Sequence, residues 1–140
     1  DSSLLFSDPL AIELTSPAWR LVCRNKLLHW LIIRKKFGHL RPIHSWILAR
    51  SRIAEHKLEA FVKAGGTQFV QLGAGFDSVA LRNPEWLKNV RIFELDHPET
   101  QSLKRERIKR NKYSLPECLE LVPIDFEEET VDDCLKRTSS

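Results

Sequence analysis

Two short apolar runs constrain this chain more than any other feature. Residues 69–77 read FVQLGAGFD and residues 92–96 read IFELD, so the first run ends in Gly-x-Gly and the second in an acid. This order and spacing are typical of the first half of a nucleotide-binding α/β sheet. Gly73 and Gly75 lack a Cβ atom, which lets the turn fold tightly and lets a ligand approach its backbone. Asp96 would lie at the tip of the neighbouring strand, where its carboxylate can accept hydrogen bonds from two ribose hydroxyls.

The glycine run indicates an adenosine-containing cofactor and leaves its class open. A dinucleotide site prefers a third glycine, and this chain has Ser78 at that position. S-adenosylmethionine has no pyrophosphate, so its site does not need the third glycine. The simplest alternative is a tight strand-to-helix turn without a ligand, and the acid at the correct offset favours the cofactor site over it.

Length and composition limit the other classes. A chain of 140 residues with 42% hydrophobic content is one globular domain, yet it is shorter than a complete doubly wound sheet, so we expect a fragment or truncated form. A net charge of +3 is too balanced to indicate nucleic-acid binding alone. The cysteines are odd in number and lack Cys-x-x-Cys spacing, which predicts neither a disulfide framework nor a metal site and favours a reducing, cytoplasmic location. No apolar stretch is long enough to cross a bilayer.

Residues 1–66 predict a helical cap region. Asp8 is a good N-cap for a first helix that starts at Pro9. Apolar residues at helical spacing then predict a second, amphipathic helix over residues 18–37 with a basic polar face. A third helix is expected over residues 43–64, ended by two glycines.

Residues 67–140 predict three strands alternating with helices, which is an α/β arrangement with a parallel sheet. We expect strands at 68–72, 90–95 and 119–124. The expected helices cover residues 79–87, residues 96–113 with Leu103 and Ile108 facing inward and an exposed charged face, and a last segment opened by the acidic run 127–129. Ligands of such sheets bind beyond the carboxyl ends of the strands. The residues at those ends are Gly73, Gly75, Asp96, Asp125 and Phe126.

Five segments together resemble the leucine carboxyl methyltransferase family of class I S-adenosylmethionine-dependent methyltransferases. They are LFSDPLA at residues 5–11, RSRIA at 50–54, QLGAGFDS at 71–78 together with Arg82, FELDHP at 93–98 and VPIDF at 122–126. The resemblance spans nearly the whole chain. It implies a Rossmann-like parallel sheet, of which residues 67–140 would supply the first half with three strands, behind the helical cap.

The resemblance also implies roles for single residues. Arg52 would bind the methionyl carboxylate of S-adenosyl-L-methionine, and Gly73 would line its methionine portion. Asp96 would hold the ribose hydroxyls, while Asp125 and the backbone N–H of Phe126 would read the adenine edge.

Two departures from the family pattern limit this transfer of roles. Val79 stands where many bacterial members have arginine, so no substrate role is expected there. A family glutamate on a later strand would fall beyond the end of this sequence.

The implied reaction is methyl transfer to an oxygen nucleophile, most simply a carboxylate. A carboxylate is ionised near neutral pH because free α-carboxyls titrate at about 3.5, so no catalytic base is expected. The acceptor could be a protein C-terminus or a small acid. Nucleic acid is not expected as a partner, except for modified tRNA. That exception is kept because some family relatives act on modified tRNA.

Three rival functions remain open at this stage. They are an NAD-dependent oxidoreductase of the same fold, a non-catalytic interaction module, and an RNA-binding module that uses the basic segments 34–36 and 104–112. No membrane partner is expected. A homo-oligomer stays open because a half sheet leaves strand edges uncovered.

Overall fold

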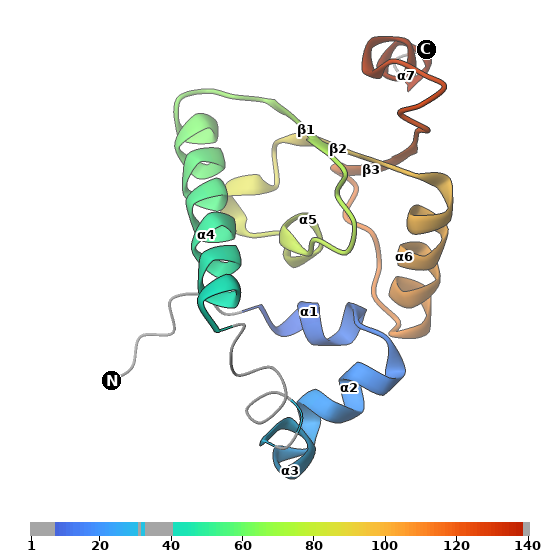
Figure 1. The fold of residues 1–140 in the computed structure, drawn as a ribbon. Helices are drawn as coiled ribbons and strands as arrows, with labels where there is room; N and C mark the ends of the chain where they lie inside the picture. Colours follow the sequence, from blue (N-terminus) through green and yellow to red (C-terminus); the bar gives the residue numbers. More distant parts are fainter. Residues whose placement is uncertain (1–7, 31, 33–40, 139–140) are drawn as a thin grey trace.

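The computed structural model describes residues 8–30, 32 and 41–138 and confirms the predicted α/β class. Its sheet has three parallel strands in the order β1 (Gln68–Leu72), β2 (Arg91–Asp96) and β3 (Leu119–Pro123). The strand positions agree with the predicted ranges to within one residue. Figure 1 shows the strands side by side, with their connections running through helices.

Helices precede and alternate with the strands (Figure 1). They are α1 (Pro9–Leu14), α2 (Pro17–Arg24), α3 (Lys26–His29), α4 (Arg41–Lys63), α5 (Val79–Arg82), the 3-10 helix η3 (Glu85–Leu87), α6 (Pro98–Arg110) and α7 (Val131–Thr138). None of these described helices is long and apolar enough to span a membrane.

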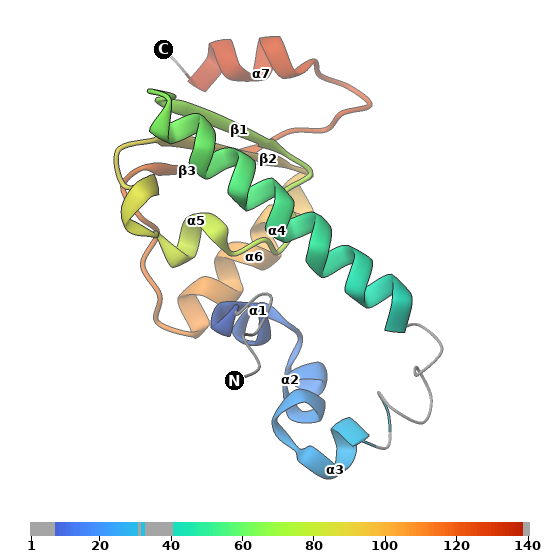
Figure 2. The ribbon, with the colours of Figure 1, turned by 90° about the vertical axis from the view of Figure 1, so that its left-hand side faces the viewer.

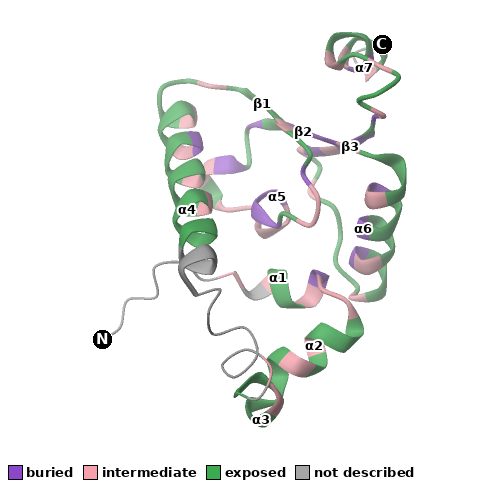
Figure 3. Cartoon of the chain, viewed as in Figure 1, coloured by how far each residue is buried: buried purple, intermediate pink, exposed green. Residues whose placement is uncertain are grey.

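The sheet carries helices on both faces. Figure 2 shows α7 on one side and α4, α5 and α6 on the other. The larger core cluster lies on the α4 side, where Leu58 packs with Val79, Ile92 and Leu121. The smaller cluster, around Cys134, lies under α7. Figure 3 shows the buried residues gathered on β2, β3 and the inward helix faces. Because Leu58 of α4 shares a core with the strands, the cap and the sheet pack together; the division at residue 66 stays a prediction.

The single helix predicted over residues 18–37 is wrong in its described part. The chain forms α2 and α3 with a break at Asn25, whose backbone has φ −94° and ψ 111°. The Asn25 side chain accepts hydrogen bonds from the N–H groups of Leu27 and Leu28, at 3.0 and 3.2 Å. Asparagine competes in this way with the helical hydrogen bonds and starts a new helix. Residues 33–40 lie outside the described part.

Two later helices also differ from the prediction. The expected helix over residues 79–87 divides at Asn83, which has a positive φ of 43° and precedes a proline. The last helix begins at Val131 and not at the acidic run. The acidic residues form a turn, because the carbonyl of Asp125 accepts from the N–H groups of Glu128 and Glu129 at 3.1 and 2.9 Å.

Helix α6 buries a different face from the one predicted. Its buried residues are Gln101, Lys104 and Ile108, while Leu103 is 47% exposed. The prediction was right for Ile108 and wrong for Leu103. Gln101 explains part of this choice, because its side-chain amide donates to the carbonyls of Glu94 and Val122, at 2.7 and 2.8 Å. The buried face of α6 is therefore largely polar and hydrogen-bonds the strands.

Candidate functional site

The glycine turn after β1 starts the site. Gly73 and Gly75 have φ of 61° and 53°, a conformation that favours glycine. The N–H of Gly73 donates to the carbonyl of Leu95 at 2.8 Å, which extends the pairing of β1 with β2 beyond the strand end. A Cβ atom added at Gly73 would meet no atom within 4 Å, so the space beside the turn is open.

Asp96 lies beside this turn at the tip of β2. One carboxylate oxygen accepts a hydrogen bond from the N–H of Gly75, and the other accepts from the N–H of His97 at 2.7 Å. An ionised carboxylate offers about four lone-pair sites, so two further donors can still bind it. The structure therefore brings the predicted ribose acid and the predicted glycine turn together.

Asp125 follows β3 and lies next to the tip of β2. The N–H of Ile124 donates to the carbonyl of Asp96 at 3.0 Å, which aligns the two strand ends. One Asp125 oxygen accepts from the N–H of Glu127 at 2.9 Å, and the other lies 3.8 Å from Nε2 of His97. Tips of β2 and β3 are thus joined through these side chains.

Phe126 is the next residue, and it is 49% exposed. Its backbone N–H donates to no other described residue. An exposed ring and a free N–H beside the strand tips suit contact with a planar, hydrogen-bonding ligand.

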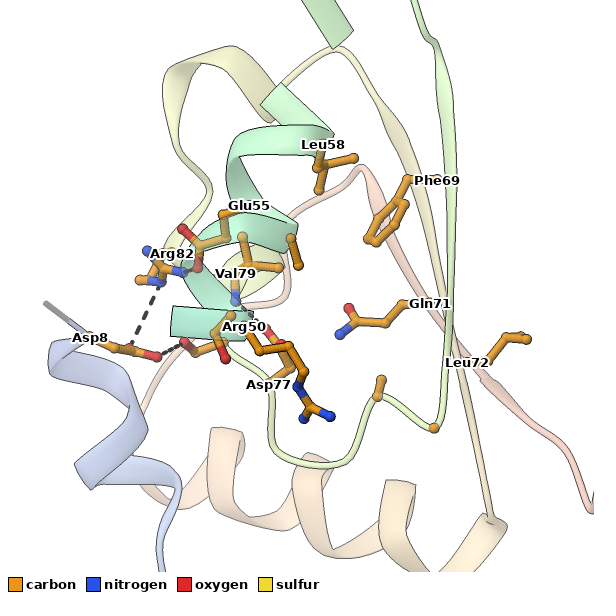
Figure 4. A pocket seen from close by; sticks show the side chains of 15 residues that line it. Asp8, Arg50, Glu55, Leu58, Phe69, Gln71, Leu72, Asp77, Val79 and Arg82 are labelled. Carbon is orange, nitrogen blue, oxygen red and sulfur yellow. Dashed lines mark hydrogen bonds and ion pairs between the residues drawn. The ribbon is translucent and has the colours of Figure 1, made fainter. Parts of the chain in front are cut away.

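A pocket of about 680 Å³ opens on the other side of the glycine turn, between α4, β1 and α5. Figure 4 shows Gln71 pointing into it from β1 and Arg50 reaching toward the turn from α4, while Leu72 points away from it. Its lining residues are Asp8, Arg50, Ser51, Ala54, Glu55, Leu58, Phe69, Gln71, Leu72, Gly73, Ala74, Asp77, Ser78, Val79 and Arg82. Gly73 is the predicted site residue that lines this pocket; Gly75, Asp96, Asp125 and Phe126 lie outside its lining.

Arg50, and not the predicted Arg52, is the arginine of RSRIA that lines the pocket. Arg52 is exposed on α4. Residues two apart on a helix do not share a face, so the two side chains diverge. Arg50 is in phase with Ala54 and Leu58, which also line the pocket. That four-residue spacing is the signal that sequence reasoning missed.

Arg50 is available to an anionic ligand. Its guanidinium lies 5.4 Å from the ring centroid of Trp46, and no carboxylate of the described residues lies within ion-pair distance of it. A guanidinium matches a carboxylate with two parallel hydrogen bonds.

Gln71 supplies a second feature of the pocket that the prediction did not include. Its Oε1 is buried and accepts no hydrogen bond from any described residue. Buried polar atoms are normally satisfied, so a buried acceptor that faces a pocket can accept a hydrogen bond from water or from a ligand there. An ammonium group would supply such a donor.

Charged side chains from three helices build the pocket wall, as Figure 4 shows. Asp8 caps α1 by accepting from the N–H groups of Leu10 and Ala11, and it also accepts from the hydroxyl of Ser78. Arg82 of α5 pairs with Glu55 of α4 and lies 3.9 Å from Asp8. These contacts hold the first helix of the cap against the pocket.

Three charged side chains of α6 contact the sheet or the segments around it, and one of them, Arg105, donates to the carbonyl of Leu121 at 2.8 Å. Lys104 is buried, and Arg107 donates to the carbonyl of Leu14 at 2.5 Å while its guanidinium lies 4.1 Å from the centroid of the Phe76 ring. Three positive charges of the segment that could have bound RNA thereby make contacts within the fold. Across the described residues, no group of His, Cys, Asp and Glu side chains could hold a metal ion.

The sequence of this chain is similar to known proteins. The sequence profile of the family described as "Leucine carboxyl methyltransferase" matches residues 1–139. The "Putative S-adenosyl-L-methionine-dependent methyltransferase YktD" of Bacillus subtilis (strain 168) is 40% identical over 79 residues, which cover 56% of this chain and 26% of that protein. A protein of Parafrankia sp. (strain EAN1pec) with the same functional name, Franean1_4929, is 32% identical over 94 residues, 66% of this chain and 30% of its own length.

The matched segments are therefore less than a third of the length of these relatives. The family profile, in contrast, covers nearly every residue of this chain, including the glycine turn and the acids at the strand tips. The chain belongs to the leucine carboxyl methyltransferase family.

Proposed function

We propose that this chain is the cofactor-binding part of an S-adenosyl-L-methionine-dependent methyltransferase. One observation carries the proposal: the glycine turn has Asp96 on one side and a pocket containing Arg50 and Gln71 on the other. S-adenosyl-L-methionine has a diol at one end of its ribose and an amino-acid group beyond its sulfonium. A site with an acid on one side of the turn and a guanidinium on the other suits both ends.

The pocket would take the amino-acid end. Arg50 would bind the α-carboxylate bidentately, and the unsatisfied Oε1 of Gln71 would accept a hydrogen bond from the α-ammonium. Gly73 would line the chain between them, because the space where a Cβ would lie is open. Arg50 replaces Arg52 in this assignment.

The strand tips would take the adenosine end. Asp96 would accept from the ribose hydroxyls while it keeps its bond from Gly75. Asp125 would accept from the adenine amino group, and the free N–H of Phe126 would donate to a ring nitrogen. These roles follow the resemblance, and the positions of the three residues at neighbouring strand tips support them.

The cofactor supplies a methyl group activated on a sulfonium. For the acceptor we propose a carboxylate, from a protein C-terminus or a small acid; a modified tRNA nucleoside is the alternative. A carboxylate needs no base, so the task of this chain would be to hold the methyl carbon and an acceptor oxygen about 3 to 3.5 Å apart and to exclude water. The cytoplasmic location and a homo-oligomeric state stay predictions.

Calorimetric titration of the purified chain tests the cofactor. S-adenosylhomocysteine, the product form, should bind with one site per chain, and NADH under the same conditions should give no heat above dilution. Binding of NADH alone would favour the oxidoreductase, and binding of neither would favour the non-catalytic module. A carboxylate acceptor is tested separately, by ester formation in the full-length enzyme.

A further inference from the structure

A buried ion pair joins α6 and β2 directly behind the glycine turn. Lys104 and Glu94 are each 1% exposed, and Nζ of Lys104 lies 2.5 Å from Oε2 of Glu94. The same ammonium donates to the backbone carbonyl of Asp77 at 2.7 Å. Lys104 therefore connects a helix, a strand and the loop that follows the glycines.

A contribution to stability does not by itself explain this buried ion pair. Removing two charges from water costs several kcal/mol per ion, and apolar side chains of similar volume at such positions are often as stable or more stable. Here the pair is also incompletely satisfied, because Oε1 of Glu94 is buried without a hydrogen bond from any described residue. A role in placing the loop explains the pair better than a role in holding the core.

The contacted loop needs an external support. Its two glycines lie at positive φ and carry little conformational preference of their own. Within the loop, the N–H of Asp77 donates to the carbonyl of Ala74 at 3.0 Å. Lys104 binds the far side of this small turn, and Arg107, one helical turn later, lies over the ring of Phe76. Helix α6 thus holds the loop at two successive residues.

We propose that Lys104, oriented by Glu94, is a positioning residue that holds the 73–78 loop in its cofactor-binding conformation. This inference rests on the proposed function. Lys104 does not line the pocket and would not touch the cofactor. It acts through the Asp77 carbonyl, which fixes the loop backbone before the ligand arrives and so lowers the ordering cost of binding.

The test replaces both charges by apolar side chains of similar length, Glu94→Met together with Lys104→Met. The matched control is Glu59→Met with Lys63→Met, which removes an ion pair of 2.8 Å on the surface of α4. Three quantities are measured on each chain: the thermal midpoint, amide hydrogen exchange of residues 73–78 without ligand, and the affinity for S-adenosylhomocysteine.

We expect the buried double variant to keep a thermal midpoint close to that of the wild type. Its loop amides should exchange at least tenfold faster, and its affinity should fall at least tenfold, whereas the control should change neither by more than twofold. A folded variant with loop exchange and affinity both within twofold of wild type would overturn the proposal.

The wild-type chain gives a result that does not depend on the variant folding. If Lys104 holds the 73–78 loop in one conformation, the Gly75 and Asp77 amides of the wild type should exchange slowly in the absence of ligand. Fast exchange of these amides would also overturn the proposal. Failure of the wild type to bind S-adenosylhomocysteine while these amides stay protected is a different outcome. It would reject the proposed function, and with it the cofactor role of the loop, while the protected amides would still show that the loop is ordered without a ligand.

Discussion

The carboxylate of Asp96 accepts a hydrogen bond from the backbone N–H of Gly75, so the acid at the tip of β2 and the turn after β1 form one unit. The turn is thereby held at Gly75 by Asp96 from the tip of β2, and at the Asp77 carbonyl by Lys104 from α6. Both supports come from outside the loop. Two flexible glycines can therefore occupy a single conformation while their own surface remains open to a ligand.

Replacing Asp96 should weaken cofactor binding strongly. Asp96→Ala removes an acceptor for two hydroxyl donors, and hydrogen bonds to charged groups contribute roughly 1.5 to 3 kcal/mol each. We expect the dissociation constant for S-adenosylhomocysteine to rise at least about tenfold, as measured by calorimetry. Asp132→Ala is the control, because Asp132 is exposed on α7 and pairs with Lys136 at 2.6 Å. Equal affinities for wild type and Asp96→Ala would remove the ribose role.

Arg50 and Arg52 should differ sharply although they are two residues apart. Arg50→Gln should weaken S-adenosylhomocysteine binding by about 10- to 100-fold, because it removes a bidentate partner of the α-carboxylate. Arg52→Gln should stay within about twofold, because its side chain is exposed outside the pocket.

Methylthioadenosine separates the two ends of the site in this comparison. It lacks the amino-acid group, so its affinity should be the same for wild type and Arg50→Gln. If Arg52→Gln lost more affinity for S-adenosylhomocysteine than Arg50→Gln, the role that the sequence resemblance implied for Arg52 would be restored.

Replacing Asp8 should lower the free energy of unfolding by more than replacing an ordinary helix cap does. Asp8→Ala removes the cap of α1 together with the partner of Ser78 and a neighbour of Arg82. A lost cap costs about 1 kcal/mol and a lost charged hydrogen bond about 1.5 to 3 kcal/mol, so we expect a loss of about 2.5 to 4 kcal/mol. Urea unfolding measures it. Ser16→Ala, which removes the cap of α2, is the control and should cost about 1 kcal/mol or less.

The strands and their tips could be predicted because the signals are local. Apolar runs bounded by glycine or an acid mark β1 and β2 to within one residue, and parallel pairing then brings Gly75 and Asp96 together. Those steps require only the strand order and the rule that ligands bind at the carboxyl ends. The same argument placed Asp125 beside the tip of β2.

The missed features depend on contacts between distant segments. Lysine is almost never fully buried without a partner, so Lys104 was expected at the surface. Its burial depends on Glu94 and on the carbonyl of Asp77, 10 and 27 residues away along the chain. Arg50 was missed for a simpler reason. The burial of Leu58 determines which face of α4 lines the pocket, and the resemblance assigned an arginine without considering that face.

The pH dependence of stability should reveal the buried carboxyl. Burial raises the pKa of Glu94 above its ordinary value of 4.5, against the opposing effect of the Lys104 ammonium. Between pH 4.5 and the higher pKa of the folded state, the folded chain therefore binds more protons than the unfolded chain. The free energy of unfolding should then fall as pH rises above about 4.5, and this contribution should stop changing above the folded-state pKa.

The Glu94→Gln variant has no carboxyl group at this position. The difference in the free energy of unfolding between wild type and this variant therefore isolates the contribution of Glu94. We expect wild type to lose stability relative to Glu94→Gln as pH rises, measured by urea unfolding from about pH 4 to pH 8. Glu85→Gln, at a side chain that is 86% exposed, is the control for losing one carboxyl from the surface. A wild type that gains stability over Glu94→Gln with rising pH would mean that attraction by Lys104 exceeds the cost of burial, and that the ion pair itself stabilises the fold.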